Sequence, residues 1–337
     1  MNNPDKSRFR VDSPTTKGVI LGKFMPPHEG HVALIRTASY LVDRLTIILS
    51  ASDSDPIPPA VRKGWMESLF PQAVVIVSNN GAEPLPPDSP DWARIIRGFH
   101  PEPIDRVIGS EGYVADLAKA LNAQHFILDP MWMAFPANSS EIRQDPFGHW
   151  NSIPDHVRPY FQKRLTLVGP ESTGKSYMAD VLARKFGGPY VPEYGRPYEK
   201  FRTPGPYKPE ELHFIVDGHV AHRKTLSMMA GPILFEDTDP LLTAVWAEML
   251  LGHSLPDLEA RIELPDHYLL LDANTPWEED PLRYYAKQEM RQKFFDRTKA
   301  KLEAFHAPYT LISGDWKNRE AQAVAVVEEM LATPKRG

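Results

Sequence analysis

The 337-residue sequence contains no cysteine, which excludes disulfide bonds and metal sites built from thiolates. No apolar run approaches the roughly 18 residues that a membrane-spanning helix needs. The first residues are polar and lack the apolar segment of a secretory signal peptide. A formal net charge of −6 argues against general affinity for nucleic acid, because nucleic-acid phosphates would repel the protein. These absences predict a cytoplasmic protein with neither membrane nor nucleic-acid partners.

The residues that are present indicate folded globular domains. Hydrophobic residues make up 42% of the sequence and charged residues 24%, which is typical of globular proteins. A chain of this length can form about two domains, each with its own core. The 34 prolines are about twice the average share of roughly 5%. Because proline is excluded from the interiors of helices and strands, they predict many stiffened loops.

Short apolar runs alternate with helical patterns along the first part of the chain. Residues 18–22 (GVILG) predict a buried strand, which a loop joins to a helix near residues 31–42. Further strands are predicted at residues 45–50, 73–78, 106–109 and 126–128. Such alternation is typical of a parallel α/β sheet. We therefore expect an α/β domain over residues 17–150, preceded by a flexible tail at residues 1–16.

The pattern is interrupted at residues 151–163 and then begins again, which indicates a junction between two domains. An apolar strand at residues 164–168 is followed by a glycine-containing loop and a helix at residues 177–186. Later strands are predicted at residues 233–235, at residues 267–271 and directly before Glu193. We expect a second α/β domain over residues 164–337, with a mainly parallel sheet in each domain.

The strongest single motif, GPESTGKS, runs from Gly169 to Ser176 and matches the pattern GxxxxGK[ST]. Gly169 and Gly174 let the backbone curl so that N–H groups face phosphate oxygens, and the next helix presents its positive N-terminus to them. Lys175 would reach the β- and γ-phosphates of ATP, and the Ser176 hydroxyl would hold Mg²⁺. The alternative, a glycine-rich turn before a helix, would not require a strand ahead of the loop. The motif therefore predicts the ATP site of a P-loop domain.

Acidic residues follow two predicted strands of the second domain. Glu193 lies after one strand and Asp237 and Asp239 close another, so they should face the crevice at the carboxyl ends of the sheet. One carboxylate can hold Mg²⁺ and another can accept the proton of an attacking hydroxyl, although surface acids in loops are the alternative. Arg196 lies near Glu193. Arg283 could belong to a lid over the ATP phosphates, although an isolated arginine is more often a solvated surface charge.

A second motif, GKFMPPHEGH, runs from Gly22 to His31, where the first strand meets the first helix. The helix N-terminus attracts phosphate. His28 and His31 can donate hydrogen bonds to oxygens that gain charge as pyrophosphate leaves. A metal site is a second interpretation, but no third ligand lies at a suitable spacing. Capping or packing histidines are the third.

GKFMPPHEGH is similar to the GxFxPxHxGH signature of the nucleotidylyltransferase superfamily, whose domain is Rossmann-like. Residues 138–143 (NSSEIR) are similar to its S-S-T-x-I-R signature, with Asn138 in place of the first serine. Residues 108–111 (IGSE) resemble its Gly-Ser-acid turn near the adenosine. The resemblance implies an ATP site made of Gly22, Phe24, His28, His31, Ser140 and Arg143.

A domain of this kind followed by a P-loop kinase resembles the NadR-type bifunctional family, from about Lys17 to about Leu331. The P-loop, the EYGR segment at residues 193–196 and the DTD segment at residues 237–239 resemble the kinase half of that family. Some members carry an N-terminal helix-turn-helix repressor domain. Only about 17 polar residues precede the first domain here, so we expect no DNA-binding function.

The resemblance implies an enzyme of NAD biosynthesis that uses ATP twice, with Mg²⁺. In the second domain the 5′-hydroxyl of nicotinamide riboside would attack the γ-phosphate of ATP, giving nicotinamide mononucleotide (NMN) and ADP. Glu193 would be the base or orient the hydroxyl, and Asp237, supported by Asp239, would bind the metal or the ribose. Glu193 and Asp237 could exchange these roles. In the first domain the NMN phosphate would attack the α-phosphorus of ATP, giving NAD and pyrophosphate. His28, His31 and Arg143 would stabilise that reaction.

The implied substrate-binding residues are Trp92, Tyr190, Arg196 and Asp239. Trp92 and Tyr190 are chosen because a cationic nicotinamide ring suits an aromatic face, although either is more often an ordinary core or surface residue. Two other interpretations remain: a kinase whose adenylyltransferase domain is inactive or differently specific, and a non-catalytic nucleotide sensor. The sequence leaves the oligomeric state, feedback regulation and acceptor specificity open.

Overall fold

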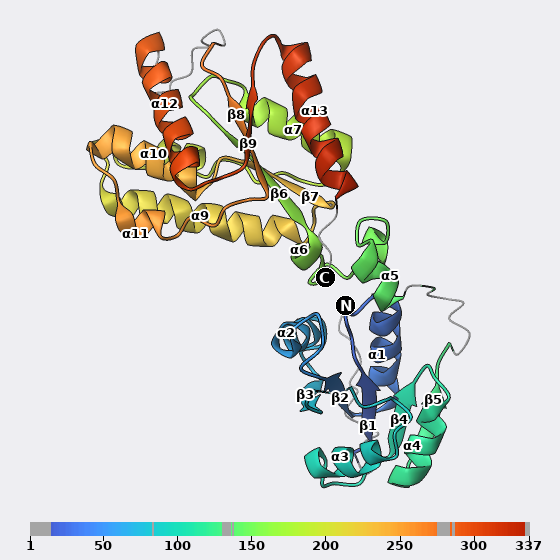
Figure 1. Cartoon of the computed structure of the whole chain (residues 1–337). Coiled ribbons are helices and arrows are strands. Elements are labelled where there is room, and N and C mark those ends of the chain that lie inside the picture. The colour runs from blue at the N-terminus through green and yellow to red at the C-terminus, as the bar shows by residue number, and fades with distance from the viewer. Residues whose placement is uncertain are drawn as a thin grey trace, which may run out of the picture. The chain divides into compact units, whose positions relative to one another are not determined.

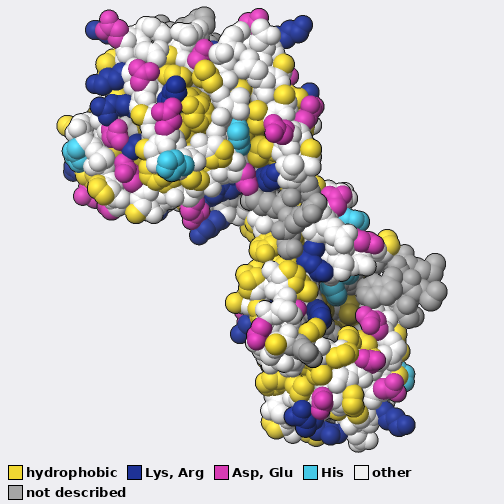
Figure 2. Space-filling model, viewed as in Figure 1, with side chains coloured by type: hydrophobic (Ala, Val, Ile, Leu, Met, Phe, Trp, Pro, Cys, Tyr) yellow, Lys and Arg dark blue, Asp and Glu magenta, His cyan; other side chains and the backbone are white. Residues whose placement is uncertain are grey.

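The computed structural model describes residues 15–82, 84–129, 136, 138–274, 284 and 287–333. The chain forms two compact units, and the boundary between Val157 and Arg158 lies inside the predicted junction (Figure 1). On the face shown in Figure 2, acidic and basic side chains are mixed over both units, in keeping with the modest negative net charge. Within the described ranges, every helix is too short or too polar to cross a membrane.

The first unit has a five-stranded sheet in the order β3-β2-β1-β4-β5, and every neighbouring pair is parallel. The strands are β1 Lys17–Gly22, β2 Arg44–Ala51, β3 Val74–Asn79, β4 Arg106–Gly109 and β5 Gln124–Ile127. The helices are α1 Glu29–Leu41, α2 Pro59–Leu69, α3 Asp91–Phe99, α4 Tyr113–Leu121 and α5 Ser139–Gln144, followed by the short 3-10 helix η2 Trp150–Ser152. The predicted Rossmann-like sheet is confirmed.

The central strand β1 is buried on both faces and positions the first site. Because successive side chains of a strand point to opposite faces, Ile20 packs with α1 and α2, whereas Val19 and Leu21 pack with α3 and α4. Strand order reverses between β1 and β4. In open α/β sheets, ligands bind at the carboxyl ends of the strands at such a reversal.

The second unit has a parallel sheet in the order β7-β6-β8-β9. The strands are β6 Lys163–Val168, β7 Ile233–Asp237, β8 His267–Leu271 and β9 Tyr309–Ile312, the last of which the sequence pattern did not predict. The helices are α6 Arg158–Phe161, α7 Lys175–Phe186, α8 Gly195–Phe201, α9 Pro209–Ser227, α10 Pro240–Leu251, α11 Pro256–Glu259, α12 Gln288–Ala304 and α13 Trp316–Ala332. Leu167 of β6 packs against α7 and α13, whereas Val168 packs against α10 and α12.

The strand predicted directly before Glu193 is wrong. Val191 makes only an isolated parallel bridge to Glu236, and no strand forms there among the residues that are described. Pro189 and Pro192 flank Val191, and proline lacks the N–H group that a strand ladder needs. Glu193 therefore lies in a connection that leads into α8.

Candidate active sites

A cavity at the carboxyl ends of β1 and β4 brings the two signatures of the first domain together. The predicted residues in its wall are Gly22, Phe24, His31, Ser140 and Arg143. The Gly-Ser-acid turn and two residues of the proline-rich loop before α3 also line it, namely Gly109, Ser110, Glu111, Leu85 and Pro87. Segments that are far apart in the sequence thus meet at one cavity.

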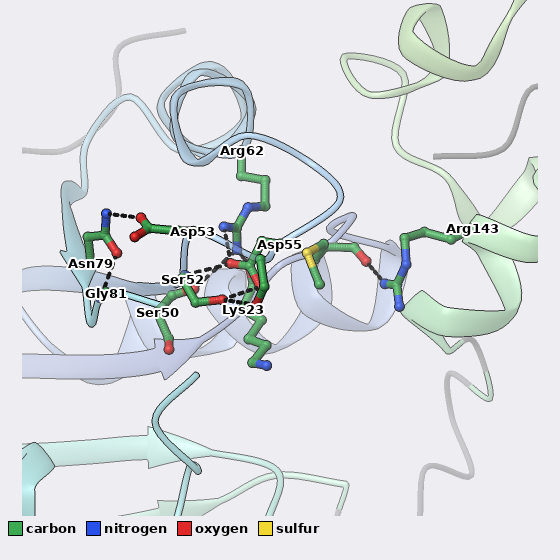
Figure 3. A network of polar contacts seen from close by, with 11 residues as sticks. Lys23, Ser50, Ser52, Asp53, Asp55, Arg62, Asn79, Gly81 and Arg143 are labelled. Atoms are coloured by element: carbon green, nitrogen blue, oxygen red, sulfur yellow. Dashed lines mark hydrogen bonds and ion pairs between the residues drawn. The ribbon is translucent and has the colours of Figure 1, made fainter. Parts of the chain in front are cut away.

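Helix α5 holds the loop between β1 and α1 in place. Ser139 Oγ donates to the carbonyl of Pro26 at 2.9 Å, and Arg143 donates to the carbonyl of Met25, across separations of 113 and 118 residues. Arg143 Nη2 also donates to Ser140 Oγ at 3.1 Å. Figure 3 shows Arg143 reaching across from its helix to this loop. Arg143 is therefore both a cation at the cavity and a link between the two signatures.

The two histidines of the first motif are in contact at the start of α1, with their ring planes tilted by 35°. His28 is the N-cap residue, and its backbone N–H donates to His31 Nδ1 at 3.3 Å. The ring centroids lie 3.8 Å apart. Because Nδ1 accepts this bond, a neutral His31 carries its proton on Nε2. His31 lines the cavity, whereas His28 is only 2% exposed and is not part of its wall.

Both imidazoles are neutral at pH 7. Burial lowers the pKa of His28 to about 4. Burial, together with the neighbouring His28, lowers the pKa of His31 well below its ordinary value. His31 can therefore stabilise developing negative charge as a neutral hydrogen-bond donor rather than as a cation.

We expect the first domain to lose stability as the pH falls from about 6.5 to about 4. Below pH 6.5 the unfolded chain protonates both histidines while the folded domain keeps them neutral, so acid favours the unfolded state. For His28 the loss approaches on the order of 3 kcal/mol at the acid end, since one pKa unit is 1.36 kcal/mol. The unfolding temperature of the first domain, measured between pH 4 and 7, should fall more steeply with decreasing pH in the wild type than in the double variant His28→Gln/His31→Gln. Equal slopes would contradict the prediction.

Trp92 and Asn138 make structural contacts in the first domain. Trp92 touches the cavity wall but is fully buried among α3 and α4, and its indole N–H donates to the carbonyl of Pro86 at 2.8 Å. This burial does not support stacking of a nicotinamide ring on Trp92, which instead anchors the proline-rich loop. Asn138 caps α5 by accepting a bond from Ser140 N at 2.7 Å.

In the second domain the P-loop joins β6 to α7, and its two predicted glycines are required by the structure. Gly169 has a φ of 138° and Gly174 a φ of 87°, both in the region that favours glycine. A Cβ atom on Gly169 would lie 2.6 Å from the carbonyl oxygen of Leu271, and one on Gly174 would lie 1.9 Å from the Trp316 ring. Both the backbone and its neighbours therefore exclude a larger residue.

The first residues of α7 bring a cation and a hydroxyl to the P-loop. Lys175 Nζ donates to the carbonyls of Gly169 and Pro170 at 3.0 and 2.9 Å. Ser176 Oγ donates to Asp237 Oδ2 at 2.5 Å, so the P-loop meets the end of β7. The positive end of the α7 dipole lies at the same place. This arrangement can bind the phosphates of a nucleotide.

Asp237 has the environment of a carboxylate that binds a divalent cation. It is buried, and its Oδ1 atom has no hydrogen-bond partner among the described residues. Burial and the charge of Glu193 raise the pKa of Asp237 to about 6. In the described ranges, no group of three or more acidic, histidine or cysteine residues is arranged to hold a metal ion by itself. Mg²⁺ commonly needs only one or two protein oxygens, with phosphates and water completing its shell. Ser176 and Asp237 suit that requirement.

A second cavity adjoins the P-loop and is lined from α8, α9 and α10. The predicted residues Lys175, Glu193 and Arg196 line it, and Arg196 Nε donates to Glu193 Oε2 at 3.3 Å. Residues that no sequence motif marked line much of the remainder, including Glu199, Tyr207, His219, Thr243, Trp246 and Tyr284.

The residues that no motif marked give this cavity aromatic walls and a carboxylate, Glu199, that accepts hydrogen bonds from two tyrosines. Tyr207 OH donates to Glu199, and Tyr284 OH donates to Glu199 Oε1 at 2.6 Å. The Trp246 ring lies 6.1 Å from the Tyr284 ring between centroids. Aromatic faces beside a carboxylate attract a cationic ring. These four residues come from separate segments, so no local pattern could have found them.

Two residues predicted to bind substrate lie outside this cavity. Tyr190 packs instead against the core under α7. Asp239 caps α10 by accepting from Leu242 N at 3.1 Å, and its other oxygen accepts from Tyr268 OH at 2.6 Å. Both oxygens of this buried carboxylate therefore accept hydrogen bonds within the protein, and the predicted contact of Asp239 with substrate stays a prediction. Arg283 lies outside the described residues.

The fold and the two sites define a class of protein in which a Rossmann-like domain and a P-loop domain, both suited to nucleotides, follow one another in a single chain. The family described as AAA domain matches residues 164–319. The chain is 28% identical to the trifunctional NAD biosynthesis/regulator protein NadR of Escherichia coli K12, covering 94% of this chain and 83% of that protein. The protein of the same name from Salmonella typhimurium is 27% identical, covering 93% and 83%. The chain is a homologue of the NadR proteins.

Two crystal structures of NadR share this fold over 95% of this chain and 97% of their own. NadR in complex with NR has a TM-score of 0.76 at 24% identity. NadR in complex with NAD and AMP-PNP has a TM-score of 0.74 at 22% identity. The fold predicted from the sequence is therefore confirmed across both domains.

Proposed function

We propose that this protein is a bifunctional enzyme of NAD biosynthesis. Its second domain phosphorylates nicotinamide riboside to NMN with ATP, and its first domain joins NMN to a second ATP to give NAD and pyrophosphate. The observation that carries the proposal is the cavity with aromatic walls that adjoins the P-loop. Homology to NadR supports it, as does the structure of a NadR protein with NR.

The cavity of the second domain suits a riboside with a cationic base. The nicotinamide ring would lie among Tyr207, Trp246 and Tyr284, and the Glu199 carboxylate would complement its positive charge. Polar residues, among them Glu193, Arg196 and Thr243, also line the cavity, which suits the ribose. The ribose 5′-hydroxyl would then meet the γ-phosphate.

Phosphoryl transfer depends on position and charge rather than on covalent chemistry by the protein. Glu193 lines the cavity and would accept the proton of the 5′-hydroxyl as its oxygen bonds to the γ-phosphorus. Asp237 is already bonded to Ser176, so these two residues would hold Mg²⁺ instead. Bound Mg²⁺ would offset charge on the β- and γ-phosphates. Lys175 would stabilise the same oxygens as the bond to ADP breaks.

In the first domain the NMN phosphate is already anionic, so the reaction needs orientation and charge stabilisation more than a base. Its oxygen would bond to the α-phosphorus of ATP as pyrophosphate leaves. His31, Ser140 and Arg143 line the cavity and would bind the phosphates through the neutral imidazole, the hydroxyl and the guanidinium. His28 would hold His31 at the start of α1.

We expect the kinase activity to require more Mg²⁺-ATP at acid pH, because a proton competes with the metal for Asp237. With a pKa of about 6, the carboxylate is roughly one-quarter ionised at pH 5.5 and almost fully ionised at pH 7.5. The apparent KM for Mg²⁺-ATP should therefore rise roughly fourfold at the lower pH. The adenylyltransferase site of the same chain is the control for the titration of ATP itself. An unchanged ratio of the two KM values would contradict the prediction.

Trp246→Leu should weaken the binding of nicotinamide riboside. A cation–π contact contributes about 0.5 to 2 kcal/mol, so the KM for the riboside should rise roughly 2- to 30-fold while kcat changes little. Steady-state kinetics with the riboside varied would measure this change. The KM for ATP is the internal control, and an unchanged KM for the riboside would place the ring elsewhere.

The proposal is tested by one incubation of the purified protein with nicotinamide riboside, ATP and Mg²⁺, followed by chromatography. Accumulation of NAD would require both activities. NMN and ADP alone would leave a kinase whose first domain is inactive or takes another substrate. No product from riboside or NMN would refute both proposed reactions and favour a nucleotide sensor.

A further inference from the structure

An arginine is fully buried beside the loop between β1 and α1 of the first domain. Arg62 of α2 is 0% exposed, and its Nη2 atom pairs with Asp55 Oδ2 at 2.6 Å. Its Nη1 atom donates to the carbonyls of Lys23 at 2.8 Å and Ser50 at 3.1 Å (Figure 3). Arg62 thus connects the residue that follows β1 to the end of β2.

The carboxylate partner is itself held in place. Asp55 Oδ2 also accepts from Ser52 N at 2.9 Å, and Asp55 Oδ1 accepts from Ser52 Oγ at 3.1 Å. Removing two charges from water is expensive, and well-packed apolar residues often stabilise a fold as well as a buried ion pair does. Stability alone therefore does not account for this pair. A planar guanidinium that holds three acceptors fixes their positions, which an apolar side chain cannot do.

The carbonyl that Arg62 holds precedes the most constrained residue of the loop. Phe24 has a φ of 48°, a conformation that non-glycine residues rarely adopt and that persists where the surroundings enforce it. The Phe24 ring packs against Gly22, where an added Cβ would lie 2.7 Å from it, and meets the His31 ring at 5.0 Å between centroids. A chain of contacts thus leads from Arg62 through Lys23 and Phe24 to His31.

We propose that Arg62 and Asp55 are a positioning pair that holds the loop after β1 so that Phe24 and His31 form the nucleotide-binding wall. Neither member of the pair lines the cavity, so neither is a catalytic residue. Arg143 and Ser139 of α5 bond to the carbonyls of Met25 and Pro26 and so hold the same loop. The kinetic test of this assignment rests on the proposed adenylyl transfer. The test by ATP binding does not.

The test is the double variant Arg62→Met/Asp55→Asn in the full chain, which removes both charges while keeping side-chain volume. Its thermal unfolding, its kcat and KM for ATP in NAD synthesis from NMN, and its kinase activity are measured together. Lys63→Met is the matched control, because Lys63 lies on the same helix with a side chain that is 43% exposed.

We expect the double variant to unfold within a few degrees of the wild type and to lose at least roughly tenfold in kcat/KM for adenylyl transfer, because small displacements of binding groups are costly. Its kinase activity and both activities of Lys63→Met should stay within twofold. Adenylyl transfer within twofold of the wild type, or a loss that follows unfolding of the first domain alone, would overturn the assignment.

If the double variant does not fold, Arg62→Lys decides, because lysine keeps the charge but lacks the planar fork. Reduced adenylyl transfer at an unchanged unfolding temperature supports a positioning role, and full activity refutes it. If the wild type makes no NAD, the proposed function fails on its own. ATP binding is then measured by calorimetry in a Lys175→Ala background, so that the first site is observed. ATP binding at least fivefold weaker in Arg62→Met/Asp55→Asn than in the Lys175→Ala background alone supports the positioning role of the pair, and equal binding refutes it.

Discussion

Lys175→Ala is expected to abolish synthesis of NMN from nicotinamide riboside while leaving NAD synthesis from NMN unchanged. Lys175 is buried at the start of α7, and its ammonium group donates to two carbonyls of the P-loop. Alanine removes the cation that would meet the β- and γ-phosphates. Loss of one such preorganised charge lowers kcat by roughly 10²- to 10³-fold. Kinase kinetics with ATP and riboside would measure the fall.

The matched control for this variant is Lys185→Ala. Lys185 lies in the last turn of the same helix and is exposed, so its removal changes the net charge equally without altering the P-loop. NAD synthesis from NMN by the Lys175 variant shows that the first domain is intact. Kinase activity within a few-fold of the wild type would show that the second domain does not use its P-loop for phosphoryl transfer.

Arg143→Ala is expected to give the opposite result, with NAD synthesis from NMN lost and the kinase retained. Its guanidinium is a cation at the cavity, and it also bonds to the carbonyl of Met25 and to Ser140 Oγ. Alanine therefore removes charge stabilisation and loosens the link between the two signatures. The fall in kcat should again be roughly 10²- to 10³-fold.

Arg143→Lys separates the two contributions of Arg143. Lysine keeps the charge but cannot reproduce the planar fork, so an intermediate activity is expected. Arg94→Ala, on the exposed surface of α3, is the control for loss of one arginine. An adenylyl transfer rate unaffected by Arg143→Ala would exclude this arginine from the site, and an equal loss of kinase activity would point to a general folding defect.

Sequence patterns were sufficient to predict the P-loop, the loop between β1 and α1 as a candidate nucleotide site, and a mainly parallel sheet in each domain. The P-loop could be predicted because its geometry depends on residues that are neighbours in the chain: Gly169 and Gly174 adopt backbone conformations that favour glycine, and Lys175 begins the next helix. The strands could be predicted because burial on both faces requires continuous apolar runs. The signature at the start of α1 could also be found in the sequence, because its residues are neighbours in the chain.

Roles that depend on distant neighbours could not be assigned in this way. Asp239 resembles a substrate ligand in the sequence, but Tyr268 and the N-terminus of α10 use both of its oxygens. Trp92 was a candidate face for the nicotinamide ring because it is aromatic, but its side chain is buried among α3 and α4. The strand predicted before Glu193 does not form, because two nearby prolines lack the N–H groups that a strand needs.

The surroundings of each loop could be identified only in the folded protein. The aromatic cavity joins Tyr207, Trp246 and Tyr284 from three segments, and Glu199 holds two of them. Arg62 reaches the carbonyl of Lys23, which lies 39 residues earlier in the chain. A phosphate-binding loop is specified by its own backbone, and therefore by adjacent residues. The walls of the second cavity and the Arg62 contact to the first loop come from side chains that meet only when the chain has folded.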